Sequence, residues 1–243
     1  MSLEDLRRSI RPLLNERDPA DALEAYYAFY HSDVRTHLVI QEGESNQTTG
    51  YLAISQTGMD LFRPLVTLRL PSGDLNGGLN LINKALPEGS DVMIYAPTSY
   101  GPLLKALFDI DADEQYRLLI IDQNRFEPII NVLVTQATAP DGHPRFIIRS
   151  QKDRSQVAAA AGVNWQTRYF AEISVTTMQG ERRQGWGRSV VASMVHHLLQ
   201  HGRTPLYVAS ERNQASLQLA ESVGFVDSGE RMIFAQATRK KNL

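Results

Sequence analysis

Apolar runs and amphipathic stretches alternate along the whole chain. In the first half, short β-branched and apolar runs predict strands, and stretches with apolar residues three or four positions apart predict helices. The predicted strands cover residues 36–41, 48–55, 65–70, 91–96 and 115–122, and the predicted helices start after Ser2 and after Asp18 or cover 72–86 and 100–108. This alternation of strands and helices predicts an α/β protein.

The second half of the chain repeats this order of elements. Its predicted strands cover residues 129–136, 145–150, 156–165, 170–177, 205–209 and 228–238, and its predicted helices cover 187–201 and 213–224. Each half therefore reads as a hairpin, a strand, a helix, a strand, a helix and a last strand. The repeat predicts two domains, residues 1–125 and 126–243, although the halves share no evident residue identity.

The composition restricts the class of protein. A hydrophobic content of 42% supports a proper core, and a net charge of −2 argues against a nucleic-acid partner. The absence of cysteine excludes disulfides, thiolate metal sites and cysteine nucleophiles. No apolar run approaches the length of about 18 residues that a membrane span needs. The first residues lack the apolar segment of a signal peptide, so a cytoplasmic protein is expected.

A loop rich in arginine and glycine separates the strand at 170–177 from the helix at 187–201. It reads Arg182-Arg183-Gln184-Gly185-Trp186-Gly187. The first amides of a helix lack acceptors within the helix, and they suit phosphate oxygens. Glycines let the backbone approach a ligand closely, and arginines add charge-assisted contacts. The pattern predicts an anion site, with a tight turn whose arginines face solvent as the alternative.

Two familiar nucleotide motifs do not match this loop. No Gly-Lys-Ser/Thr follows the glycines, as a nucleotide-triphosphate loop requires, and the third glycine of the dinucleotide fingerprint is absent. The corresponding turn of the first half, residues 71–78, carries Asp74 and no arginine. Only the second half is therefore predicted to bind an anion.

Residues 145–236 resemble the GNAT superfamily of acyl-CoA-dependent N-acyltransferases. The resemblance rests on the signature Arg182-x-x-Gly185-x-Gly187 and on residues 213–225, which are similar to the closing helix of the family with its Asn and terminal Gly-Phe. The first half is similar in element order alone, as in tandem members of the superfamily. The resemblance implies a mixed, mostly antiparallel central sheet with flanking helices, which splays open in the second half after the strand carrying Val175.

This resemblance also implies a cofactor site for acetyl-CoA. Main-chain groups of Val175 and Thr177 would pair with the pantetheine arm, and Asn213 would contact it with Ser216 at the cofactor edge. For Asn213 helix capping is the alternative role, and the two are compatible. The pyrophosphate would lie on the amides of Arg183, Gln184, Gly185, Trp186, Gly187 and Arg188, next to Arg182. Trp186 itself is expected to pack against the following helix.

Acyl transfer to an amine needs a base, a donor to the oxyanion and an acid for the leaving thiolate. The resemblance indicates a backbone N–H near Val175 as the donor, and Glu172 as the base, with a surface charge as the alternative role. Many members place the acid at a tyrosine where this chain has Ala220. Tyr207 lies on a predicted strand beside the cleft and is expected to reach the substrate.

The two adjacent histidines are not predicted to act in catalysis. By helical phase His196 faces solvent and His197 flanks the apolar stripe. Neither has metal-ligand spacing, so no metal site is predicted.

The sequence thus predicts an N-acetyltransferase that moves the acetyl group of acetyl-CoA to a primary amine. The acceptor, a small molecule or a peptide, is not identified, and both a monomer and a homodimer fit the sequence. The alternative is a non-catalytic protein that binds or senses acyl-CoA, which Ala220 and the degenerate first half favour. A scaffold without any ligand is the third reading.

Overall fold

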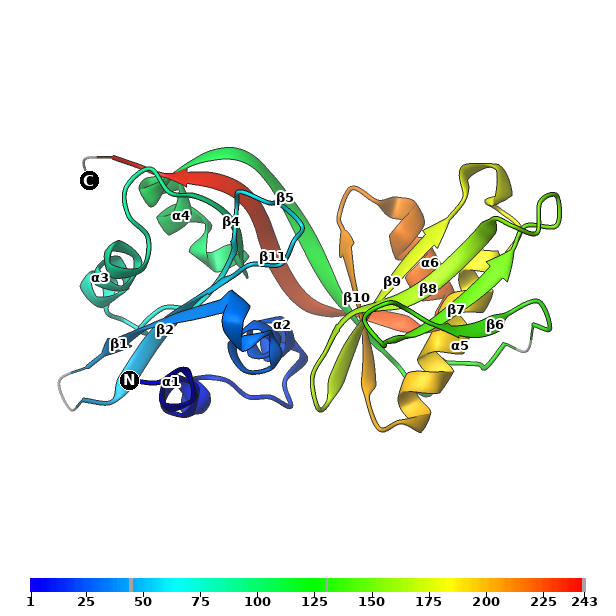
Figure 1. Cartoon of the computed structure of the whole chain (residues 1–243), viewed down its shortest axis with the longest axis horizontal. Helices are drawn as coiled ribbons and strands as arrows, with labels where there is room; N and C mark the ends of the chain where they lie inside the picture. Colours follow the sequence, from blue (N-terminus) through cyan, green and yellow to red (C-terminus); the bar gives the residue numbers. More distant parts are fainter. Residues whose placement is uncertain (44–45, 130, 242–243) are drawn as a thin grey trace. The chain divides into compact units, whose positions relative to one another are not determined.

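The computed structural model describes residues 1–43, 46–129 and 131–241 (Figure 1). The chain folds into two compact units, one formed by Met1–Tyr116 with Arg231–Leu243 and the other by Arg117–Glu230. Two long strands, β5 (Phe108–Ile121) and β11 (Phe225–Arg239), contribute to both units. The predicted division into domains 1–125 and 126–243 stays a prediction.

The first unit is a mixed sheet with helices on both faces. Its strands follow the order β1-β2-β3-β4-β11, in which β3 and β4 are parallel and the β1–β2, β2–β3 and β4–β11 pairs are antiparallel. Its elements before β5 are α1 (Leu3–Ile10), α2 (Ala22–Ala25) continued by a π-helical turn (Tyr26–Tyr30), β1 (Thr36–Glu42), β2 (Thr48–Ser55), β3 (Leu65–Arg69), α3 (Leu75–Ala85), β4 (Asp91–Pro97) and α4 (Gly101–Leu107).

Alternation along the strands builds the two apolar layers of this unit. Tyr51 and Ala53 of β2 pack with α1 and α2, whereas Leu52 between them packs with α3 and α4. Successive side chains of a strand point to opposite faces, so one apolar run serves both layers. A capping box begins α1: Ser2 Oγ accepts the Asp5 N–H at 3.2 Å, and the Asp5 carboxylate accepts the Ser2 N–H at 3.2 Å.

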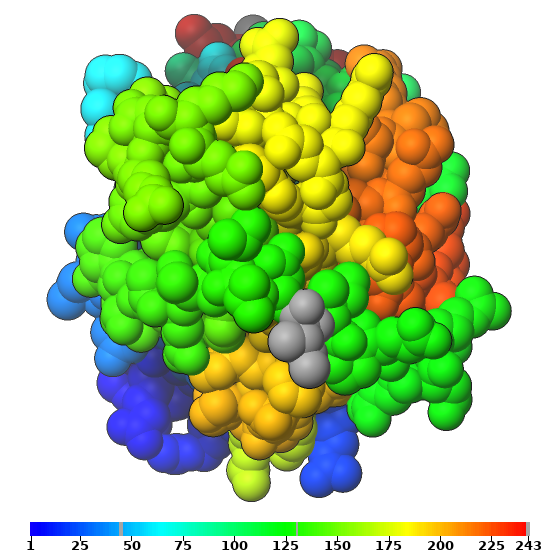
Figure 2. Space-filling view, turned by 90° about the vertical axis from the view of Figure 1, so that its right-hand side faces the viewer, coloured from blue at the N-terminus to red at the C-terminus, as the bar shows by residue number. Residues whose placement is uncertain are grey.

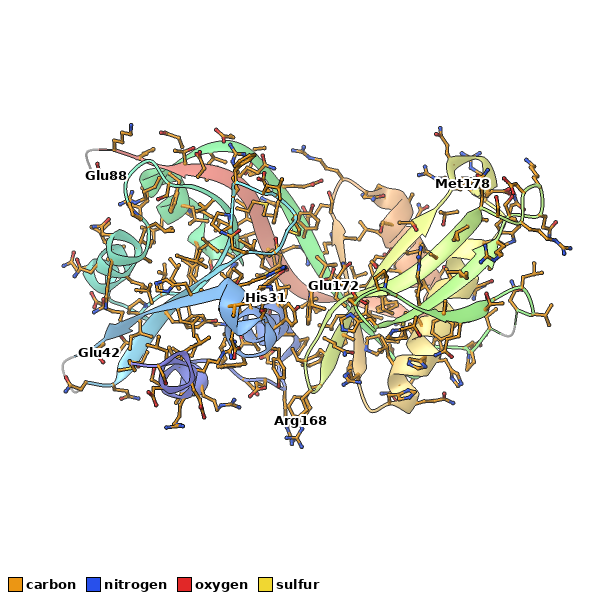
Figure 3. All side chains as sticks on the ribbon, viewed as in Figure 1. His31, Glu42, Glu88, Arg168, Glu172 and Met178 are labelled. Carbon is orange, nitrogen blue, oxygen red and sulfur yellow. The ribbon has the colours of Figure 1, made fainter. Side chains whose placement is uncertain are left out.

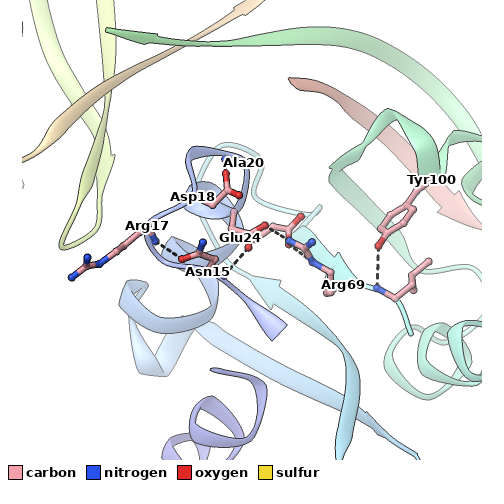
Figure 4. A network of polar contacts seen from close by, with 9 residues as sticks. Asn15, Arg17, Asp18, Ala20, Glu24, Arg69 and Tyr100 are labelled. Atoms are coloured by element: carbon pink, nitrogen blue, oxygen red, sulfur yellow. Dashed lines mark hydrogen bonds and ion pairs between the residues drawn. The ribbon is translucent and has the colours of Figure 1, made fainter. Parts of the chain in front are cut away.

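A partly buried ion cluster ties the second helical segment to β3 (Figure 4). The guanidinium of Arg69 donates to Asp21 and to Glu24, whose side chain is almost fully buried. Burial raises the pKa of Glu24 to about 7, and the charge of Arg69 opposes that rise. Nearby, Leu70 donates its N–H to the hydroxyl of Tyr100 at 3.3 Å.

The second unit carries its helices on one face of its sheet. The strand order is β11-β5-β10-β9-β8-β7-β6; β9 and β10 are parallel, while the β6–β7, β7–β8 and β8–β9 pairs are antiparallel. Its elements between β5 and β11 are β6 (Thr135–Thr138), β7 (Pro144–Arg149), β8 (Val157–Gln166), β9 (Phe170–Thr177), α5 (Trp186–Gln200), β10 (Thr204–Ser210) and α6 (Gln214–Val223). The apolar stripe of α5 is buried in its core and consists of Val190, Val191, Met194, Val195 and Leu198. The predicted α/β mixed sheet with flanking helices is confirmed.

Two predicted strands have other bounds. The strand predicted over 129–136 is wrong for most of its length: β6 covers Thr135–Thr138, residue 130 lies outside the described residues, and Val132 is 91% exposed. Asn131 turns the chain there, because its carbonyl and side-chain oxygens accept the N–H groups of Val134 and Leu133. The strand predicted from 115 begins at Phe108 in β5. The acidic first part of β5 has low strand propensity, but pairing with its neighbour in the sheet overrides this local preference.

No helix of the described residues combines the length and the apolar character needed to cross a bilayer.

Gly224, which ends α6, should not tolerate a side chain. Its φ is +109°, and a methyl group there would come within 3.0 Å of the backbone of Arg125 and Phe126. We expect Gly224→Ala to lower the free energy of unfolding by about 2 kcal/mol or more, measured by urea denaturation. Gly202→Ala is the matched control, because φ is +70° but the space is open. Equal losses in both variants would contradict the role of the close backbone.

Candidate functional site

The sheet of the second unit splits between two of its parallel strands. The pairing of β9 with β10 ends at Glu172 and Leu206, although β9 continues to Thr177 and β10 to Ser210. Beyond Glu172, β9 stays paired with β8 on its other side. The structure therefore has a gap along one edge of β9, where a ligand can take the place of a strand.

Backbone groups of β9 face this gap. Met178, just past the strand, donates its N–H to the carbonyl of Ala158 in β8 at 2.8 Å. Backbone direction alternates along a strand, so Ser174 and Thr176 also point to β8, while Val175 and Thr177 point to the gap. Figure 3 labels Glu172 and Met178, which bound the stretch of β9 along the gap.

The loop after β9 presents a row of amides without acceptors. Among the described residues, no hydrogen-bond acceptor meets the backbone N–H groups of Trp186, Gly187 and Arg188; the first amide of α5 that donates within the chain is that of Ser189, which donates to the carbonyl of Gly185 at 3.0 Å. Gly185 and Arg183 have φ of +76° and +64°. Such a turn followed by a helix N-terminus concentrates donors and positive dipole at one point, which suits an anion.

The start of α5 packs tightly against the end of β9 and against α6. A methyl group at Gly187 would come within 3.2 Å of Thr177 Oγ1 and 3.4 Å of Leu219 Cδ2. Arg182 donates through Nε to the carbonyl of Thr177 at 3.5 Å, and Arg188 donates to the carbonyl of Ser222 in α6 at 3.0 Å. The amides, the arginines and the gap therefore meet at the end of β9.

A buried glutamate that sequence reasoning missed fixes this loop. Glu181 is 4% exposed, and its carboxylate accepts from Ser150 Oγ at 2.7 Å and from Gln184 Nε2 at 2.9 Å. Ser150 lies at the end of β7 and is itself buried. A glutamate directly before Arg182 was visible in the sequence, but its burial was not. Glu181 holds the loop in the shape that leaves its amides open.

The other side of the gap carries polar side chains from β10 and α6. Asn213 caps α6 by accepting the Ser216 N–H at 3.1 Å, so the predicted cap is confirmed. The hydroxyl of Tyr207 lies 2.9 Å from Ser216 Oγ. Burial raises the pKa of Tyr207, the hydrogen bond with Ser216 opposes this, and the charge of Glu172 adds to the rise. The phenol is therefore protonated at neutral pH and can donate.

Glu172 lies at the point where the strands separate. It is half-buried, and Asn164 Nδ2 donates to its carboxylate at 3.1 Å. Burial raises the pKa of Glu172 to about 7, although its hydrogen bonds oppose the rise. A carboxylate with this pKa can exchange protons near neutral pH, which suits a general base.

The remaining predicted residues lie outside the gap. Trp186 is buried in the core of the second unit and Ala220 is fully buried there, so that position supplies no hydroxyl. His196 is exposed, and the ring of His197 lies 5.6 Å from that of Phe146. These positions match the packing and solvent roles predicted from helical phase. The described residues contain no cluster of acidic or histidine side chains that could hold a metal ion.

Comparison with known proteins finds a matching family model and solved structures with the same fold. Residues 147–234 match the family model described as GNAT acetyltransferase. A solved tandem GNAT protein from the clavulanic acid biosynthesis pathway is 11% identical, with a TM-score of 0.67 over 100% of this chain and 98% of that chain. A GCN5-related N-acetyltransferase from Sphaerobacter thermophilus is 12% identical, with a TM-score of 0.62 over 100% and 96%.

A third solved structure, an acetyltransferase of the GNAT family from Colwellia psychrerythraea, is 12% identical, with a TM-score of 0.58 over 95% of this chain and 97% of that chain. At these identities the solved structures show the fold. No curated protein matches the chain.

Proposed function

We propose, since this chain belongs to the GNAT superfamily, that it is an N-acetyltransferase that moves the acetyl group of acetyl-CoA to a primary amine. The family and the fold support acyl transfer in general. The observation that carries the finer proposal concerns both ends of the unpaired part of β9. Where the pairing with β10 ends lies Glu172, a carboxylate with a raised pKa. Just past the last residue of β9 follows a row of backbone amides that are open to a ligand.

The gap and the loop fit the parts of acetyl-CoA in order. The amides of residues 183–188 would hold the pyrophosphate, with Arg182 and Arg183 adding charge. The pantetheine arm would pair with the backbone of Val175 and Thr177, as a missing strand would. Asn213 and Ser216 would contact it from α6. This order places the thioester near Glu172.

In the proposed reaction the neutral amine nitrogen forms a bond to the thioester carbonyl carbon, and Glu172 accepts the proton that this nitrogen loses as the bond forms. The N–H of Val175 donates to the carbonyl oxygen as negative charge develops on it. The carbon–sulfur bond breaks, and the sulfur leaves with the electron pair of that bond. The proton that the thiolate needs would come from Tyr207, directly or through Ser216, because Ala220 has none to give.

The second candidate is a protein that binds acyl-CoA without turning it over. Ala220 favours it, because the position of the usual acid is a buried methyl group. The two candidates differ in turnover and not in binding.

Calorimetric titration with acetyl-CoA, followed by an amine panel with thiol detection, tests the proposal. We expect saturable binding of acetyl-CoA and CoA, no binding of ATP, and release of free thiol that depends on an amine. Binding without thiol release over a broad panel of amines and peptides would favour the sensing protein. No binding of either CoA species would overturn the acyltransferase function.

Replacing Glu181 by Ala should weaken cofactor binding more than it slows turnover. Without the carboxylate, Gln184 and Ser150 lose their shared acceptor, and the loop loses its fixed shape. Hydrogen bonds to a charged group are each worth about 1.5–3 kcal/mol, so we expect KM for acetyl-CoA to rise roughly tenfold at nearly constant kcat. Steady-state kinetics measure both constants.

Glu181→Gln is the matched control. A glutamine oxygen can still accept from one partner, so KM should recover in part. An equal fall in kcat and no change in KM would contradict the role of Glu181 in positioning the loop.

A further inference from the structure

A second loop lies against the proposed pyrophosphate loop. Residues 150–156 join β7 to β8, and β8 begins beside the end of β9, with Ala159 opposite Thr177. The hydrogen bond between Ser150 and Glu181 joins the two loops directly. Figure 2 shows this face, on which the segment near residue 150 is yellow-green and the segment near 180 is yellow. Both loops therefore lie at the same end of the sheet.

The joining loop carries two cations that are open to solvent. The Ser150 hydroxyl, which donates to the buried carboxylate of Glu181, also accepts the N–H groups of Lys152 and Asp153. The side chains of Lys152 and Arg154 are exposed, and within the described part of the chain neither forms an ion pair.

Asp153 lies between Lys152 and Arg154 in the sequence, but in the described part of the chain its carboxylate forms no ion pair with either of them. The carboxylate of Asp153 accepts from Ser155 Oγ at 2.6 Å and from Gln156 Nε2 at 2.7 Å, so it is turned into its own loop. Together with Arg182 and Arg183, the two cations make this end of the sheet basic in a chain whose net charge is −2.

In the proposed function, the orientation of the cofactor brings its adenosine close to the loop 150–156. The pantetheine arm runs along β9 from Thr177 towards Glu172, so the adenosine lies on the other side of the pyrophosphate, beyond the end of β9. CoA differs from dephospho-CoA by a phosphomonoester on the 3′-hydroxyl of that adenosine. A phosphomonoester attracts exposed cations, and arginine binds it in a bidentate manner.

We propose that Lys152 and Arg154 form a subsite for the 3′-phosphate of CoA, so that the protein discriminates CoA from dephospho-CoA. The inference rests on the proposed function and adds cofactor specificity to it. Arg212, which follows β10 on the other border of the gap, is the competing cation. The loop 150–156 is favoured because it carries two cations and is bonded to the pyrophosphate loop through Glu181.

Calorimetric titration of four proteins with CoA and with dephospho-CoA tests the subsite. The proteins are the wild type, Lys152→Ala with Arg154→Ala, the charge-preserving Lys152→Arg with Arg154→Lys, and Arg212→Ala. Exposed charge pairs are individually weak, so we expect the wild type to bind CoA about fivefold to tenfold more tightly than dephospho-CoA. The double alanine variant should lose that difference by weaker binding of CoA, with unchanged binding of dephospho-CoA.

The charge-preserving variant and Arg212→Ala should keep the difference between the ligands. Equal affinity of the wild type for both ligands would overturn the subsite while leaving the proposed function intact. If Arg212→Ala lost the difference in affinity between CoA and dephospho-CoA while the double alanine variant kept it, the subsite would lie at Arg212, on the β10 side of the gap, and the proposal would be overturned. Failure of both ligands to bind the wild type would overturn the proposed function and the subsite with it. Thermal unfolding without ligand checks that each variant folds.

Discussion

Replacing Glu172 by Gln is expected to lower kcat by about 10²–10⁴-fold, the range that general bases contribute. The side chain keeps its size and can still accept the hydrogen bond of Asn164, so the variant removes the proton acceptor and little else. Acetyl-CoA should bind as before, because the proposed pyrophosphate contacts lie beyond Thr177. Steady-state kinetics with the best amine of the panel, together with calorimetry, measure both effects.

The pH dependence gives a second readout for Glu172. Its pKa is raised from 4.5 to about 7, so the carboxylate is the proton acceptor only above that value. We expect kcat to rise with pH through an apparent pKa near 7 in the wild type. This ascending limb should be missing in Glu172→Gln. A variant with unchanged turnover, or a wild type without the limb, would contradict the assignment of the base.

The same group makes a prediction about stability. A carboxyl whose pKa is higher in the folded state binds its proton more tightly when folded. Its contribution to stability is therefore present below the unfolded pKa and is lost as the pH rises through the folded value of about 7. Glu172→Gln should gain thermal stability relative to the wild type in alkaline buffer and match it in acid. This check separates a folding defect from a loss of catalysis.

Replacing Gly187 by Glu is expected to weaken acetyl-CoA binding by about 100-fold or more. Its side chain would crowd Thr177 and Leu219, and its charge would repel a pyrophosphate at the start of α5. Loss of charge-assisted contacts of about 1.5–3 kcal/mol each gives this magnitude when two or more are lost. Calorimetric titration of acetyl-CoA measures the change.

Gly180→Glu is the matched control for this variant. It adds the same charge to the same loop, but a side chain at Gly180 meets nothing within 4 Å. Its binding of acetyl-CoA should fall by a few-fold at most. If both variants bound equally well, the amides of α5 would not hold the pyrophosphate. The melting temperature of each protein without ligand shows whether the mutation acts on binding or on folding.

The first half of the chain also has a split pair of parallel strands, but a side chain caps the helix that follows. The pairing of β3 with β4 ends at Thr67 and Tyr95, although both strands continue. Asp74 caps α3 by accepting the Gly77 N–H at 2.8 Å, where the second unit leaves its amides open. A carboxylate at this helix start competes with an anionic ligand. The prediction that the second half alone binds an anion stays a prediction, which binding measurements can test.

The sequence by itself determined what depends on neighbours along the chain. The order of strands and helices follows from apolar periodicity, and the ends of α6 follow from the cap at Asn213 and the turn at Gly224. The loop of arginines and glycines was recognisable for the same reason, since its residues are consecutive. These signals failed at the acidic start of β5, where strand pairing overrides local propensity, and at residues 131–134, where a turn at Asn131 replaces the predicted strand.

Only the tertiary structure decided what depends on residues far apart. Ser150 and Glu181 are 31 positions apart, so no local pattern could reveal that their hydrogen bond fixes the loop. The pairing of β9 with β10 ends at Glu172, and this position depends on two strands that lie far apart in the sequence. The pKa of Glu172 then depends on burial by side chains from several strands. Periodicity specifies which face of an element is apolar, but burial and charge in the site arise only when the elements pack together.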